Sequence, residues 1–100
     1  MSSHKFSLPQ PDRIDGTAED GSVLELARVW VCGGQPEIIV RPAFDDPKIM
    51  GQMLAELCWN FAHAYERRGG MSAFEALDKL REGWAEGHRL GDAVNPRSPQ

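Results

Sequence analysis

The segment "ARVWVCGGQPEIIVRP", residues 27–42, constrains the fold more than any other part of the chain. Two short runs rich in β-branched residues flank a Gly-Gly pair, a pattern typical of an antiparallel β-hairpin. Because successive side chains of a strand point to opposite faces, the hairpin has two distinct faces. One face carries only apolar residues, and we expect helices to cover it: Ala27, Val29, Val31, Ile38 and Val40.

The opposite face of this hairpin mixes large apolar side chains with arginines. A loop of residues 33–36 pairs Trp30 with Ile39. In that register Arg28 faces Arg41, and like charges placed directly opposite each other are destabilising. Either the register shifts by two residues, or an anionic group lies between the two guanidinium groups. The sequence leaves both alternatives open.

The stretch "FDDPKIMGQMLAELCWNFAHAYERRGG" predicts a long helix. Asp46 is a good N-cap, and Pro47 occupies the first helical position, where its missing N–H has no cost. Arg67 and Arg68 complement the helix dipole, and Gly69 can end the helix. At a period of 3.6 residues, one broad apolar stripe is formed by Met50, Met53, Leu54, Leu57, Cys58, Phe61 and Tyr65.

A second helix is predicted immediately afterwards. Ser72 and Glu75 have the spacing of a capping box, in which each side chain satisfies a backbone N–H at the helix start. Gly83 and Gly87 each cost about 0.5–1 kcal/mol relative to alanine inside a helix. Close approach of a neighbouring helix would explain them, and an early end of the helix is the alternative. The apolar face carries Phe74, Leu77, Leu80 and Trp84.

These elements predict one α+β domain with the order β-β-α-α. One hundred residues are typical of a single domain, and 41% hydrophobic with 26% charged residues is an ordinary globular composition. We expect the domain to span residues 23–90, between a flexible N-terminal arm, 1–22, and a flexible C-terminal tail, 91–100.

The predicted elements expose more apolar surface than they can cover, because a lone two-stranded hairpin needs further packing. Large exposed apolar patches usually contact a partner, most commonly a second copy related by a twofold axis. We therefore predict a homodimer that extends or covers the sheet. The alternative is that the N-terminal arm covers the patch within one chain. The predicted interface residues are Leu26, Trp30, Ile39 and Trp59.

Composition argues against binding to nucleic acid, insertion into a membrane and secretion. A net charge of −4 and a pI near 5.3 give no attraction to nucleic acid. No apolar run is long enough to span a membrane or to serve as a signal peptide. Cys32 and Cys58 lack the spacing of a disulfide framework and an activating neighbour, so we expect a reducing, cytoplasmic setting.

Few residues are candidates for ligand binding, proton transfer or metal binding. Arg28 and Arg41 would suit a carboxylate or phosphate if the first register holds, and Glu25 or Glu37 are alternative partners. His63 lies on a polar ridge of the first helix, either as a proton carrier or as part of a solvated face. His88 has no ligand partner at a metal-binding spacing. We predict no catalytic residue, no metal and no cofactor.

Two functions follow from these features. The first is an interaction or accessory module without catalytic activity, whose partner is a second copy and whose further partner the sequence does not name. The second is a small anionic-ligand binder or enzyme with a pocket between sheet and helices, contacted by Arg28, Arg41 and His63.

Residues 23–65, "VLELARVWVCGGQPEIIVRPAFDDPKIMGQMLAELCWNFAHAY", carry a family resemblance. The carrying features are the "RVWV-GG" strand and turn, the "DP" helix start, and a helix with "G-x-x-L-A-E-L" that ends in "AHAY". With the second helix, the chain over residues 23–85 resembles a family of short bacterial proteins known only as a domain of unknown function. The resemblance implies an α+β domain of bacterial origin, and no activity or site residue comes with it. The N-terminal arm is longer here than this resemblance implies.

Overall fold

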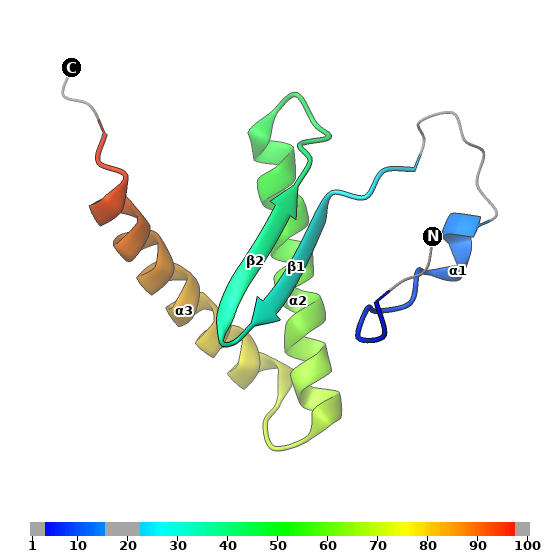
Figure 1. Cartoon of the computed structure of the whole chain (residues 1–100). Helices are drawn as coiled ribbons and strands as arrows, with labels where there is room; N and C mark the ends of the chain where they lie inside the picture. The colour runs from blue at the N-terminus through cyan, green and yellow to red at the C-terminus, as the bar shows by residue number, and fades with distance from the viewer. Residues whose placement is uncertain (1–3, 16–22, 98–100) are drawn as a thin grey trace. The chain divides into compact units, whose positions relative to one another are not determined.

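The computed structural model describes residues 4–15 and 23–97, with the elements in the order α1, β1, β2, α2, α3 (Figure 1). The antiparallel hairpin followed by two long helices confirms the predicted β-β-α-α order. The chain divides into two compact units, Met1–Asp45 and Asp46–Gln100, which we describe separately. The elements are α1 Asp12–Asp15, β1 Ala27–Cys32, β2 Gln35–Val40, α2 Pro47–Arg68 and α3 Ala73–Val94.

The hairpin turns on a two-residue loop. Gly33 and Gly34 have φ angles of 57° and 81°, a left-handed conformation that only glycine adopts readily and that matches the twist of the flanking strands. The register is therefore shifted by two residues from the one that a four-residue loop would give. This is the first of the two alternatives that the sequence left open. Arg28 faces Ile39, and Trp30 faces Glu37. The like-charge arginine pair does not form.

The two faces of the hairpin are covered differently from what the alternation predicts. The apolar face, expected to be covered, is exposed: Val31 by 74%, Val40 by 68%, Val29 by 64% and Ile38 by 58%. A two-stranded sheet is a single layer, and the described residues of its own unit provide no second layer on this side.

The mixed face of the hairpin is covered only in part, at Trp30. Trp30 is half-buried, and the His4 ring meets it edge-on with the ring centroids 5.3 Å apart. Phe6, Leu8 and Pro9 line a shallow pocket together with Trp30. The start of the chain thus covers Trp30 within one copy, whereas Ile39 on the same face stays 74% exposed.

Both ends of α2 follow the sequence signals. The Asp46 side chain accepts a hydrogen bond from the Lys48 N–H at 3.0 Å, and Pro47 begins the helix. At the other end Gly69 has a φ of 96°, and its N–H donates to the carbonyls of Tyr65 and Glu66. A glycine is required there because other residues rarely adopt this φ.

The start of α3 is capped from two directions. The Ser72 hydroxyl accepts from the Glu75 N–H at 3.1 Å, as the capping box predicts. A carboxylate oxygen of Glu66 in α2 accepts from the Ala73 N–H at 2.9 Å, which links the end of one helix to the start of the next. The helix then continues through Gly83 and Gly87 to Val94, past the predicted domain end at residue 90.

Replacing Ser72 by alanine is expected to destabilise the protein by about 1 kcal/mol, because the N-cap acceptor is lost. Chemical denaturation followed by circular dichroism measures this free energy of unfolding. Ser72→Asp keeps an acceptor oxygen and should retain most of the stability. Equal losses in the two variants would show that the acceptor oxygen at position 72 is not what stabilises the helix start.

The core between α2 and α3 is small. It lies near the loop that joins the helices, and from there the helices diverge (Figure 1). Alanine allows two helices to approach closely but buries little apolar surface. Of the residues that the structure describes, the buried ones are Ala62, Ala73, Ala76 and Leu77.

Candidate interaction surface

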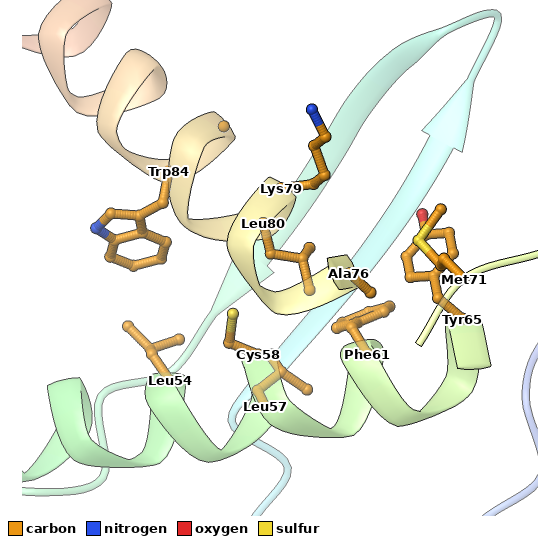
Figure 2. A pocket seen from close by; sticks show the side chains of 11 residues that line it. Leu54, Leu57, Cys58, Phe61, Tyr65, Met71, Ala76, Lys79, Leu80 and Trp84 are labelled. Atoms are coloured by element: carbon orange, nitrogen blue, oxygen red, sulfur yellow. The ribbon is translucent and has the colours of Figure 1, made fainter. Parts of the chain in front are cut away.

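An apolar groove of about 620 Å³ lies between the diverging parts of α2 and α3. Leu54, Leu57 and Phe61 line it from α2, and Leu80 and Trp84 line it from α3 (Figure 2). Lys79 is the charged residue among the described side chains that line the groove, and its ammonium group points away from these apolar side chains (Figure 2). The groove is therefore shaped to contact apolar surface.

The large side chains of the groove are far from buried. Trp84 is 55% exposed, Phe61 52% and Leu57 49%, and Leu54 and Tyr65 are each 39% exposed. Full burial of a large apolar side chain is worth about 1.5–3 kcal/mol, so this groove forgoes several kcal/mol while it faces water. Contiguous exposed apolar surface is typical of interaction sites, so the groove is a candidate for one.

The charged groups form short-range pairs on exposed surfaces. The Arg28 Nε donates to a carboxylate oxygen of Glu25 at 2.8 Å, and Arg89 pairs with Glu86 one turn earlier in α3. The hydrogen bond from Arg89 lowers the pKa of the Glu86 carboxyl. Because these pairs are solvated, they contribute little to stability. Among the described residues no charged or polar side chain is buried.

The three predicted ligand contacts belong to different units, Arg28 and Arg41 to the first and His63 to the second. Arg28 is engaged by Glu25 and lies opposite Ile39, so the cross-strand arginine pair is absent. The Arg41 N–H donates to the Leu26 carbonyl at 2.7 Å, which continues the strand pairing. His63 belongs to the helical unit, where its ring stacks against Trp59 with centroids 5.9 Å apart. The predicted anion site required Arg28 and Arg41 to face each other across the hairpin, and the observed register does not pair them.

The predicted interface residues lie in different surroundings. Leu26 and Trp30 are half-buried, and Ile39 is exposed. Trp59 is half-buried, with the Phe74 ring edge-on to it at 5.8 Å. Their role in an interface stays a prediction, and Ile39 is the most accessible of the four.

The groove residues were recognisable from the sequence, although their role was not. The periodicity of α2 places Leu54, Leu57, Phe61 and Tyr65 in one stripe, and a stripe of this kind normally packs into a core. The splay of the helices leaves this stripe half-exposed instead. The signal that could have shown this is the excess of alanine, at positions 62, 73 and 76, where the helices meet.

The remaining candidates do not form a chemical site. Cys58 lines the groove, Cys32 is exposed at the end of β1, and both are free thiols. The ring of His88 lies against Trp84, with centroids 4.7 Å apart. Within residues 4–15 and 23–97, no three potential metal ligands gather. No helix in this same part of the chain has the length and apolar character needed to cross a membrane.

The fold and the groove define a small β-β-α-α protein with an exposed apolar groove. A family model for a "Domain of unknown function (DUF5076)" matches residues 7–88, so the chain belongs to this family. This confirms the resemblance inferred from the strand, turn and helix motifs. The match begins within the predicted N-terminal arm.

One solved structure with a similar fold comes from the photosynthetic bacterium Rhodopseudomonas palustrus CGA009 and is described as a "putative pyruvate dehydrogenase". It is 26% identical in sequence and superimposes with a TM-score of 0.65. The match covers 89% of this chain and 99% of that one. No curated protein matches this chain.

Proposed function

We propose that this protein is a homodimeric interaction module that acts by binding and not by catalysis. The observation that carries the proposal is the half-exposed apolar groove between α2 and α3. A second copy is the partner that such surface most commonly meets. The two free thiols, one of them exposed, support a reducing, cytoplasmic setting.

The composition of the core supports this proposal energetically. Alanine loses little side-chain entropy on folding but also buries little apolar area, and three of the four residues found buried in the described part of the chain are alanines. Apart from Leu77, large apolar side chains of both helices, such as Leu57, Phe61 and Trp84, are left about half in water. Association would transfer these side chains out of water, and their burial would stabilise both copies.

The solved neighbour is described as a "putative pyruvate dehydrogenase". Chemistry of that kind requires a bound cofactor and polar groups that orient its reactive atoms. The groove of this chain offers apolar side chains, with Lys79 directed away from them (Figure 2). We therefore propose an accessory, non-catalytic role for this chain, in which the dimer presents a surface to another protein.

The competing function is the binding of a small anionic ligand through Arg28, Arg41 and His63. Arg28 already has a carboxylate partner in Glu25, so the present geometry favours this function less. A thermal-shift screen against anionic metabolites distinguishes the two functions. Reproducible stabilisation that Arg41→Ala abolishes would support the ligand binder.

Sedimentation equilibrium of the full chain over a range of concentrations tests the dimer. We expect a species of twice the chain mass of 11.1 kDa, in reversible equilibrium with the monomer. A single species of monomer mass at every concentration would refute the proposed function.

A further inference from the structure

We propose that the two α3 helices of the dimer cross antiparallel at Gly87, so that the C-terminal half of each α3 lies in the α2–α3 groove of the other copy. This inference rests on the proposed homodimer and specifies its interface. The occupant of the groove is thus residues 84–94 of a second copy.

The first support is the spacing of the glycines in α3. Gly83, Gly87 and Gly91 are four residues apart and therefore lie along one face of the helix. A Cβ added at any of them would meet no atom of the described chain within 4 Å, so no contact within one copy requires glycine there. Glycine inside a helix is unfavourable, and closely approaching helices are a recurrent reason to retain it.

The second support is that this face is complementary to itself. In an antiparallel crossing with a twofold axis at Gly87, residues equally distant from position 87 lie at the same level. Gly83 then lies level with Gly91, and Leu80 lies level with Val94. Trp84 of one copy then lies level with Leu90 of the other copy, next to Gly91 of that copy. The Trp84 ring can therefore pack on the surface that Gly91 leaves open. Such a face therefore has small residues where its own copy would approach most closely.

The third support is the continuity of the surface. A shallow depression lined by Trp84, Gly87, His88 and Gly91 shares Trp84 with the groove. Gly83 itself lines the groove, so the face that carries the glycines continues into the groove lined by Leu54 and Leu57 of α2. Beyond Gly87, Leu90 is 54% exposed and Val94 is 77% exposed, and these are the side chains that would fill the other copy's groove.

The area available matches what a stable dimer needs. With large side chains contributing about 150–250 Å² each when free, the groove together with Leu90 and Val94 exposes on the order of 800 Å² of apolar surface, about what one partner buries in a standard interface. In the dimer each copy contributes both parts of this surface, because its groove receives the other copy while its own Leu90 and Val94 enter the other copy's groove. A short apolar peptide or a small ligand would fill the groove but leave Leu90, Val94 and the glycine face in water.

Disulfide cross-linking of the full chain tests the crossing. In a Cys32→Ser, Cys58→Ala background that still sediments as a dimer, Gly87→Cys should cross-link with itself under mild oxidation at least tenfold faster than the matched control Ala85→Cys. Residue 85 lies on the opposite face of α3, and a disulfide requires the two Cα atoms to be within about 7 Å. Gly83→Cys and Gly91→Cys should each fail to cross-link alone but cross-link when mixed.

The outcomes separate this inference from the proposed function. A dimer in which Gly87→Cys reacts no faster than Ala85→Cys would overturn the crossing and leave the homodimer intact. Self-cross-linking of Gly83→Cys at the rate of Gly87→Cys would indicate parallel helices and would also overturn it. A parent chain that is monomeric in sedimentation would refute both.

Discussion

A Phe61→Asp variant is expected to sediment as a monomer at concentrations where the parent chain is fully dimeric. Phe61 is 52% exposed in the groove, so a single copy tolerates the change, whereas a dimer would have to bury a carboxylate among apolar side chains. We expect dimer affinity to fall by at least about 100-fold, which corresponds to about 2.7 kcal/mol. Sedimentation equilibrium gives the two dissociation constants.

The neighbouring residue provides a matched control. Asn60 is exposed, and its side chain donates to the Glu56 carbonyl of the same helix. Asn60→Asp therefore adds the same charge to the same turn of α2, outside the groove, and should leave the dissociation constant within a few-fold of the parent. If both variants weaken the dimer equally, net charge and not the groove determines association. If neither does, the groove is not the interface.

The second large effect is expected at Leu77. This side chain is 4% exposed and is the largest of the buried residues that hold α2 to α3. Leu77→Ala removes its contacts and leaves a cavity, so we expect a loss of about 2–5 kcal/mol in the free energy of unfolding. Folded domains are stable by only about 5–15 kcal/mol, so the loss is a large fraction of the total. Urea denaturation followed by far-ultraviolet circular dichroism measures it.

Arg81→Ala is the control for Leu77→Ala. Residue 81 lies one turn later in the same helix and is exposed, and alanine is a better helix former. Its effect should stay within about 0.5 kcal/mol, as for most surface substitutions. Both variants must be compared at one protein concentration, because association adds to the apparent stability. A loss at Leu77 no larger than that at Arg81 would mean that the buried cluster does not hold the helices together.

Local signals predicted the elements well because they are decided within a few residues. Asp46 followed by Pro47 begins α2, and Ser72 with Glu75 begins α3, since each pattern satisfies backbone groups that no distant residue can reach. The alternation in residues 27–32 and 35–40 similarly predicts two strands. Capping and alternation are properties of short segments, and a sequence displays them directly.

The register of the hairpin and the end of α3 were harder to predict from the sequence. The segment 33–36 accommodates either a two-residue or a four-residue loop, and the left-handed φ of Gly33 and Gly34 decides between them. In α3, two interior glycines suggested either an early end or a close neighbour, and the helix continues to Val94. Both choices depend on small free-energy differences that propensity alone does not resolve.

The faces were assigned correctly, but their burial was not. Periodicity places Leu54 and Phe61 on one side of α2, and alternation places Val29 and Val31 on one side of β1, but neither pattern states what covers that side. The contact between His4 and Trp30 joins residues far apart in sequence and has no local signal. The groove exists because the helices touch through alanines at one end and then diverge, which is a property of their packing.

The melting temperature of the full chain, measured by circular dichroism over a hundredfold range of protein concentration, shows whether folding and association are linked. If the apolar groove is covered by a second copy only in the folded dimer, mass action requires the melting temperature to rise steadily with concentration. Phe61→Asp should lower the melting temperature and remove this dependence. A parent melting temperature that is the same at every concentration would show that one copy folds without its partner and would contradict the proposed dimer.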